Sequence, residues 1–256
     1  MRKTLVDVAR LTKAYGEHRA VDRVSFDVRT GEVVSIVGPS GAGKTTVLRV
    51  VAGLLEPTSG SVTIDGVPVT GPPAGIAVVF QDYSRSLLPW LTVLGNVTLP
   101  LRAKGLSRAD ARRTATEALA AVGLGDAARQ RPRALSGGMQ QRVAIARAIA
   151  YRPKLLLMDE PFASVDAQTR MDLEDLVHPL RDRYDMTVVL VTHDIDEAVY
   201  LSDRIVVLSP APATVLRIID VDLPFPRSQT ATKELAAFGG LRREVLDLVR
   251  RPADPA

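Results

Sequence analysis

The chain has 256 residues, with 33 Lys+Arg against 29 Asp+Glu and a formal net charge of +4. That length allows one large domain or two modest ones. The composition, 46% hydrophobic and 24% charged, is that of a globular chain with a sizeable core and excludes a disordered or fibrous protein. The absence of cysteine excludes a disulfide scaffold, thiolate catalysis and cysteine-ligated metal sites, and agrees with a cytosolic location.

Charge and hydropathy argue against direct contact with nucleic acid or passage through a membrane. The basic residues are spread along the chain, which favours solvated faces with some attraction for anionic ligands or an anionic membrane surface. No segment approaches the ~20 apolar residues needed to cross a bilayer, and the first residues lack the apolar core of a signal peptide. We expect a chain that stays soluble on the cytoplasmic side, with any membrane role supplied by a partner.

The first eighty residues predict several strands and one helix. Apolar and polar residues alternate in some segments, as in half-buried strands, whereas others are densely apolar. A wide apolar stripe predicts the helix. The predicted strands are Leu5–Leu11, Val24–Val28, Glu32–Val37, Val62–Ile64 and Ile76–Phe80, and the predicted helix is Lys44–Leu55.

The middle of the chain, about 85–150, is rich in Ala and Arg and contains no convincing strand. It predicts a helical subdomain inserted into an α/β core. Within it, residues 107–122 are predicted to form a helix, with Ser107 as N-cap and Asp110 completing a capping box.

Two continuous apolar runs, Leu155–Met158 and Thr187–Val191, indicate parallel strands that are buried on both faces. Helices at about 168–184 and 195–202 are expected to separate them from a last strand at Ile205–Leu208. The tail has apolar residues at near-helical spacing from Leu235 to Leu248, and Gly239-Gly240 is expected to weaken or break that helix.

A phosphate-binding motif follows the strand that ends at Val37. The segment Gly38–Thr45 reads GPSGAGKT, fits G-x-x-x-x-G-K-[ST] and opens a predicted helix. Glycines let backbone N–H groups turn toward phosphate oxygens, and the helix N-terminus adds partial positive charge. Lys44 would reach the β- and γ-phosphates, and the Thr45 hydroxyl would bind Mg²⁺. A plain glycine-rich turn is the alternative, but the flanking strand and helix favour a nucleoside triphosphate site.

Polar residues also follow three other predicted strands. Asp159 and Glu160 end an apolar run, and this placement suits Asp159 for holding Mg²⁺ and Glu160 for orienting or deprotonating a water. Gln81 and His193 follow two further strands. Each of these placements alone is often incidental. Because ligands bind beyond the carboxyl ends of parallel strands, the ends of these three strands are expected to converge with Gly38, the fourth strand end, on one edge.

A second anion-binding element lies in the helical region. Leu135–Arg142 reads LSGGMQQR, with Ser136 as N-cap and paired glycines at the start of a helix. One nucleotide does not obviously use both elements within one monomer. A head-to-tail dimer with two-fold symmetry would let each copy's second element close on the other copy's phosphate loop.

Together these motifs resemble the ATP-binding subunit of an ATP-binding cassette (ABC) transporter, over about residues 5–210. The resemblance implies a P-loop NTPase α/β core with a mostly parallel sheet, an N-terminal antiparallel β subdomain and an inserted helical subdomain. It places the ATP-binding domain at 1–220, with the helical subdomain at about 85–150, and a short C-terminal helical tail at 221–256.

The resemblance also assigns roles to individual residues. It makes Glu160, His193 and Gln81 catalytic, and Thr45, Gln81 and Asp159 ligands of Mg²⁺. Tyr15 matches the aromatic residue that stacks on adenine, although a strand-end tyrosine is more often merely half-exposed. The residues implied to bind ATP are Tyr15, Gly38, Pro39, Ser40, Gly41, Ala42, Gly43, Lys44, Thr45, Thr46, Ser136, Gly137, Gly138, Gln140 and Asp166.

Two positions depart from the usual family pattern. Met139 stands where Gln is most frequent, although importer subunits commonly carry LSGGMQQR. Ser164-Val165 precedes Asp166 where Ala-Leu is more usual. Neither change removes a phosphate ligand or the base, so an active ATPase is expected.

Residues 80–97 and the tail are similar to the nitrate/sulfonate/taurine importer group, whose relatives also carry thiamine-precursor pyrimidines. The resemblance implies a subunit that hydrolyses ATP to energise import of a small anion. Leu87–Leu91 is either a surface that couples to the membrane subunit or a patch buried in the helical subdomain. The implied partners are a second copy, integral membrane permease subunits and, indirectly, an extracytoplasmic solute-binding protein. The implied location is peripheral, on the cytoplasmic face of the membrane.

Two other functions share part of this pattern. Soluble ABC ATPases act on nucleic acid or ribosomes, but they typically carry two cassettes or a long coiled-coil insert, and this chain has one phosphate loop and no sustained heptads. A P-loop metabolite kinase would have no use for LSGGMQQR. No nucleic acid partner is therefore expected.

Overall fold

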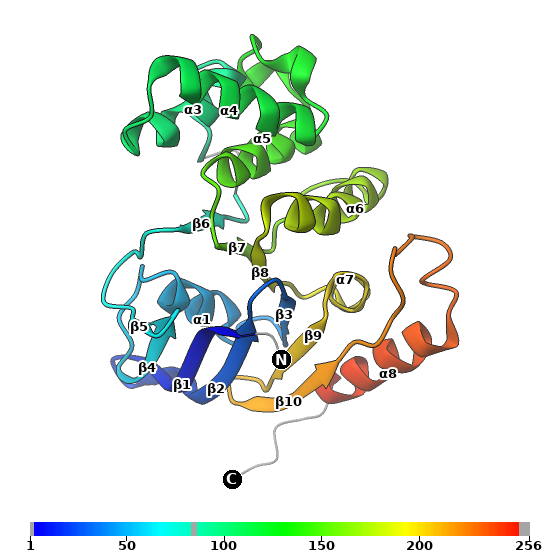
Figure 1. Cartoon of the computed structure of the whole chain (residues 1–256). Helices are drawn as coiled ribbons and strands as arrows, with labels where there is room; N and C mark the ends of the chain where they lie inside the picture. Colours follow the sequence, from blue (N-terminus) through cyan, green and yellow to red (C-terminus); the bar gives the residue numbers. More distant parts are fainter. Residues whose placement is uncertain (1–2, 83–85, 251–256) are drawn as a thin grey trace. The chain divides into compact units, whose positions relative to one another are not determined.

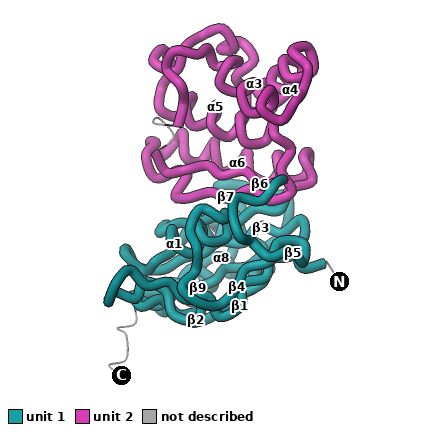
Figure 2. Tube along the Cα trace, turned by 90° about the vertical axis from the view of Figure 1, so that its left-hand side faces the viewer, with its two compact units in different colours: residues 1–74, 187–256 teal, residues 75–186 magenta. Residues whose placement is uncertain are grey.

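The computed structural model describes residues 3–82 and 86–250. Its contacts divide the chain into two compact units, residues 1–74 with 187–256 and residues 75–186 (Figure 2). The boundaries expected from sequence, 1–220 with a helical part at about 85–150, stay a prediction. The contact division places residues 75–82 and 151–186 with the helical region.

The first unit contains an antiparallel sheet in the order β2-β1-β4-β5 (Figure 1). Val6 and Val8 of β1 lie opposite Val28 and Phe26 of β2, and all four side chains are buried. This sheet is the expected N-terminal antiparallel subdomain, with strands longer than the alternation alone predicted. The strands are β1 (Thr4–Tyr15), β2 (His18–Arg29), β4 (Ser59–Ile64) and β5 (Val67–Pro68).

The first unit also contains parallel strands whose side chains are buried on both faces. β3 (Val33–Val37) pairs in parallel with β8 (Thr187–Val191) and with β9 (Arg204–Leu208). Every residue of these three strands is buried, as continuous apolar runs predict for parallel sheets.

One further strand shows that the prediction of a last strand at Ile205–Leu208 was wrong. β10 (Val215–Asp220) pairs antiparallel with β9 at the edge of the sheet. Most of its residues are exposed, so its sequence lacks the apolar signal of a buried strand, and its conformation follows from pairing with β9.

The helices of the first unit are α1 (Lys44–Val51), α7 (Ile195–Leu201) and α8 (Ala236–Arg250). α1 ends before the predicted Leu55 because Gly53 adopts a left-handed φ of 68°, where an added Cβ would overlap the Gly71 carbonyl. α8 continues unbroken through Gly239-Gly240, where the sequence predicts a weakened or broken helix. Burial of Phe238 and Val245 offsets the helix propensity lost at the two exposed glycines, about 1 kcal/mol each.

The second unit combines two parallel strands with helices. β6 (Ile76–Val79) pairs with β7 (Leu155–Asp159). Between Ser86 and Ala150, all of which the structure describes, there is no strand, in agreement with the prediction. The helices are α3 (Val93–Ala103), α4 (Arg108–Ala121), α5 (Gly137–Ala150) and α6 (Ala167–Tyr184), with short 3₁₀ turns at Gly125–Ala127 and Pro132–Ala134.

Two helices of the second unit illustrate what the sequence does and does not predict. The cap of α4 is confirmed, because Ser107 Oγ accepts a 3.1 Å bond from the Asp110 N–H and donates to Asp110 Oδ2 at 2.7 Å. α3 was not predicted, since Gly95 and Pro100 are poor helix formers. Within residues 3–82 and 86–250, no helix is long and apolar enough to cross a membrane.

A buried ion-pair network joins the two sheets of the first unit. Arg204 of β9 donates to Glu32 from Nε at 2.6 Å and from Nη2 at 3.0 Å, and its Nη2 also donates to the Asp27 carbonyl of β2 at 2.7 Å. Burial alone lowers the pKa of Arg204, but hydrogen bonds to Glu32 and Asp27 outweigh it and hold the pKa above its ordinary value. The guanidinium therefore stays charged inside the protein.

Replacing Arg204 is expected to destabilise the protein strongly. In Arg204→Met, Glu32 (3% exposed) becomes a buried carboxylate that has lost this ion pair, so the free energy of unfolding falls by about 3–5 kcal/mol. Urea denaturation measures the free energy of unfolding. The double variant Arg204→Met, Glu32→Gln should recover part of the lost stability. The control Lys3→Ala breaks the exposed Lys3–Asp65 pair and should change stability by at most ~1 kcal/mol. Equal effects of Arg204→Met and Lys3→Ala would contradict the prediction.

Candidate functional site

The predicted phosphate loop lies between β3 and α1 in the first unit. Gly41 and Gly43 have φ values of 77° and 79°, which side chains other than glycine rarely adopt. Gly43 is the N-cap of α1, and a Cβ there would lie 3.0 Å from the Ala20 carbonyl oxygen. The glycines are thus required by backbone geometry, and they turn the chain into the helix N-terminus.

Lys44 lies at the centre of this loop. It is 6% exposed, and its Nζ donates to the carbonyl oxygens of Gly38 and Pro39 at 2.9 Å each. Thr45 and Thr46 follow in the first turn of α1, half-buried, while Ser40 and Gly41 are exposed. A buried ammonium, two hydroxyls and a helix N-terminus beneath a solvent-open loop fit a triphosphate with its Mg²⁺.

The structure places His193 beside this loop, at the same edge of the sheet. β3 and β8 run parallel with Ile36 opposite Val191, and the Thr192 N–H donates to the Ile36 carbonyl. The chain then leaves β3 at Gly38 and β8 at His193, so two of the four predicted strand ends are neighbours. His193 is exposed there.

Tyr15 lies at the end of β1, also in the first unit. Its side chain is 49% exposed, and Lys13 Nζ lies 5.4 Å from the ring centroid. A half-exposed aromatic ring of this kind offers apolar surface on which a planar base can stack. Stacking of adenine on Tyr15 stays a prediction.

The second unit brings together Gln81, Asp159 and Glu160. β6 and β7 are parallel with Val79 opposite Met158, so both chains leave the sheet at one edge. Gln81 Nε2 donates to Glu160 Oε2 at 3.3 Å, and Asp159 is buried at the end of β7. The predicted convergence of all four strand ends stays a prediction, because two belong to each unit.

Glu160 has an unusual backbone conformation, with a φ of 44°. Residues other than glycine rarely adopt this left-handed region, and such strain is concentrated at functional sites. The strain turns the chain sharply at the end of β7 and presents the carboxylate to Gln81. This geometry suits Glu160 for orienting a water molecule.

The LSGGMQQR element forms the start of α5 as expected. Ser136 is the N-cap, with Oγ accepting from the Met139 N–H at 3.3 Å, and Gln140 Nε2 donates to the Leu135 carbonyl at 3.2 Å. Ser136 and Gly137 are exposed, so this helix N-terminus is open to an anion.

Asp166 caps α6 and connects to the α5 element through Thr169. The Asp166 carboxylate accepts from the Thr169 N–H at 3.0 Å and from the Thr169 hydroxyl at 2.7 Å. These bonds hold the pKa of Asp166 below its ordinary value. Gly138 lies against Thr169, and a Cβ added at Gly138 would overlap Thr169 Cγ2. Thr169 therefore fixes the spacing between the two segments.

Sequence reasoning missed two residues of this arrangement. Thr169 could have been found from the Asp-x-x-Thr spacing of an N-cap. Gln141 is fully buried, and its Nε2 donates to the Pro161 carbonyl at 2.6 Å, which joins α5 to the residue after Glu160. No signal in the sequence distinguishes Gln141 from the neighbouring polar residues Gln140 and Arg142, which are only partly buried.

Comparison with known proteins identifies the family. The family model for ABC transporters matches residues 21–163. The nitrate transport protein NasD of Klebsiella oxytoca is 43% identical over 93% of this chain and 91% of its own length. The bicarbonate transport ATP-binding protein CmpC of Synechocystis is 46% identical over 90% of this chain, which corresponds to 35% of that longer protein.

A solved structure agrees with these matches. The dimeric post-hydrolysis state of the ATP-binding cassette MJ0796, bound to ADP and Pi, superposes with a TM-score of 0.74 at 37% identity, over 85% of this chain and 99% of that one. The chain belongs to the ABC transporter family. It is an ATP-binding subunit of that family, an ATPase that uses ATP with Mg²⁺. Mg²⁺ in such a site neutralises charge on the phosphates.

The contact between Gly138 and Thr169 makes a specific prediction. Gly138→Ala should displace Thr169 from Asp166 and lower the ATP hydrolysis rate about 10- to 100-fold, the cost of a small misplacement in a catalytic arrangement. ATP binding to the phosphate loop, followed with a fluorescent analogue, should be unchanged. Adding Thr169→Ser removes Cγ2 but keeps the hydroxyl, so the double variant should recover activity. A double variant as slow as Gly138→Ala would contradict this account.

Proposed function

We propose that the chain energises the import of a small anion, such as nitrate, a sulfonate or taurine. The observation that carries this proposal is the 43% identity to NasD, a nitrate transport protein, over nearly the full length of both chains. The similarity to a bicarbonate transport protein supports the same substrate class, because bicarbonate and nitrate are both small oxyanions. We place the chain on the cytoplasmic face of the membrane, bound to permease subunits, with an extracytoplasmic solute-binding protein as an indirect partner.

The residues described above suggest a cycle in which ATP binding and hydrolysis alternate. The Gly38–Thr46 loop would hold the triphosphate of ATP, and Tyr15 would contact adenine. Two copies would associate head to tail, so that the Ser136–Gln140 element of one closes on the phosphate loop of the other. Glu160 would then orient the attacking water, and hydrolysis would reopen the dimer and return the permease to its other state.

This cycle predicts the behaviour of Glu160→Gln. The amide cannot accept a proton from water, so hydrolysis should slow by about 10²- to 10⁴-fold while ATP still binds. The variant should accumulate as an ATP-bound dimer, which size-exclusion chromatography with ATP and Mg²⁺ detects. Glu117→Gln makes the same chemical change on exposed α4 and should behave as the wild type. A Glu160→Gln protein that stays monomeric with ATP would refute the cycle.

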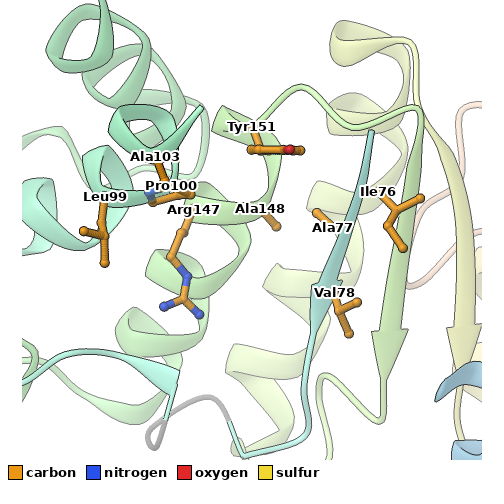
Figure 3. A pocket seen from close by; sticks show the side chains of 9 residues that line it. All are labelled: Ile76, Ala77, Val78, Leu99, Pro100, Ala103, Arg147, Ala148 and Tyr151. Carbon is orange, nitrogen blue, oxygen red and sulfur yellow. The ribbon is translucent and has the colours of Figure 1, made fainter. Parts of the chain in front are cut away.

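We propose that the permease docks on an apolar groove of the second unit. It measures about 480 Å³ and is lined mainly by apolar side chains of β6, α3 and α5 (Figure 3). Arg147 of this groove donates from Nη1 to the Ser86 carbonyl at 2.5 Å and from Nη2 to Ser86 Oγ at 2.7 Å. Burial lowers the pKa of Arg147. The groove is thereby tied to the segment that follows Gln81.

The segment Leu87–Leu91 was expected to be either a coupling surface or a buried patch, and it contains residues of both kinds. Leu87 is buried, whereas Trp90 is 67% exposed. Asn96 holds this loop by accepting from the Leu88 N–H at 2.7 Å and donating to the Leu88 and Thr92 carbonyls. An exposed tryptophan on a fixed loop is typical of an interface hot spot, so we assign Trp90 to the permease contact.

Trp90→Ala should weaken binding to the permease by about 30-fold, the effect of losing a hot-spot residue. Affinity purification from gently solubilised membranes, with mass spectrometry, measures how much multi-spanning permease is recovered. Val67→Ala removes another exposed apolar side chain, on β5, and should recover as much permease as the wild type. Recovery of only ribosomal or DNA-bound proteins with the wild type would overturn the transport function and favour the soluble alternative.

A further inference from the structure

The position of His193 depends on the start of α7. Only Asp194 separates His193 from this helix, and Asp194 is the N-cap. Its Oδ1 accepts from the N–H groups of Asp196 and Glu197 at 2.9 and 3.1 Å, and its own N–H donates to Thr192 Oγ1 at 3.0 Å. His193 is therefore held between the end of β8 and the first turn of α7. A shift of that turn moves His193.

The carboxyl end of α7 is fixed to the sheet by buried and partly buried hydrogen bonds. Ser202 donates to Ser35 of β3, and Asp203 exchanges bonds with Val33, accepting from its N–H at 2.8 Å and donating to its carbonyl at 2.7 Å. The amino end, next to His193, lies farther from these anchors. α7 has only seven residues, and helices this short depend on tertiary contacts for their stability.

The C-terminal segment, residues 221–250, contacts α7 at both ends. Arg227 Nη1 donates to the Tyr200 carbonyl in the last turn at 2.6 Å, and Lys233 Nζ lies 5.2 Å from the centroid of the Tyr200 ring. Arg242 Nε donates to Asp196 Oδ1 in the first turn at 2.5 Å. Figure 1 shows α8 beside α7, and buried Phe238 and Val245 anchor α8 on the first unit.

We propose that residues 221–250 form a clamp on α7 and that Arg242 is a positioning residue for His193. The proposal rests on the proposed hydrolysis cycle and on the catalytic role that the family resemblance implies for His193. Arg227 holds the end of α7 that is already fixed, whereas Arg242 holds the end that carries the histidine. Loss of Arg242 should therefore reduce kcat for ATP hydrolysis with little effect on KM, because its bond acts on the first turn of α7 and not on the phosphate loop or Tyr15.

The chain offers a closely matched control. Arg217 of β10 bonds Glu244 of α8 at 2.8 Å, with side chains 60% and 40% exposed, against 56% and 42% for Arg242 and Asp196. Both pairs tie α8 to the first unit, but only Arg242 reaches α7. Arg242→Ala should lower kcat of the full-length chain about two- to fivefold, the range for an exposed ion pair. Arg217→Ala should leave kcat unchanged, with equal thermal stability of the two variants.

Hydrogen exchange gives a readout that does not depend on activity. In Arg242→Ala, the amides of Asp196 and Glu197, which donate to Asp194, should exchange about two- to fivefold faster than in the wild type and in Arg217→Ala. Unchanged exchange at these amides would overturn the clamp.

The His193→Ala background separates the clamp from the proposed function. If Arg242 acts through His193, Arg242→Ala causes no further loss of kcat there, whereas a general structural role would lower kcat by the same factor as before. His193→Ala with wild-type activity would refute the role of the histidine itself. A slow His193→Ala combined with equal kcat for Arg242→Ala and Arg217→Ala would refute the clamp alone.

Discussion

The parallel pairing of β3 with β8 is the constraint on which the first unit depends. It places the phosphate loop, which follows β3, beside His193, which follows β8, before any side chain contributes. The pairing requires both strands to be buried on both faces, which is why their sequences are continuous apolar runs. The Arg204 network then holds this core against the antiparallel sheet through Glu32 and Asp27. The position of the phosphate loop and His193 at the edge of the sheet is thus a consequence of how the buried strands pack.

In the second unit, too, parallel strand pairing brings predicted site residues together at one edge. β6 and β7 bring Gln81 to Glu160, Gln141 ties α5 to the residue after Glu160, and Thr169 holds the Asp166 cap of α6. The Gln141 bond is fully buried, so tight packing lets it transmit small displacements between α5 and the segment after β7. The Arg147–Ser86 bonds extend the ties to the groove proposed for the permease. These bonds therefore connect the groove to Ser86, five residues after Gln81 in the sequence.

Most of the fold and the motif residues were predictable from sequence, and the failures have physical reasons. Buried strands and the Ser107 cap carry strong local signals, so their positions were predicted well. β10 and the full length of α8 depend on pairing and burial supplied by distant residues, which no local pattern reports. The end of α1 at Gly53 reflects the close approach of Gly71. At the site, the motifs predicted the candidate residues and the elements that carry them, whereas the contacts of Thr169 and Gln141 exist only in the folded chain.

The left-handed backbone at Glu160 has a further consequence. Strain of this kind costs about 1–3 kcal/mol, a sizeable fraction of the net stability of a domain. Glycine would relieve the strain but would remove the carboxylate that bonds Gln81. Under the role proposed for Glu160, selection for thermal stability and selection for turnover therefore oppose each other at this position. A chain selected only for stability would favour glycine here.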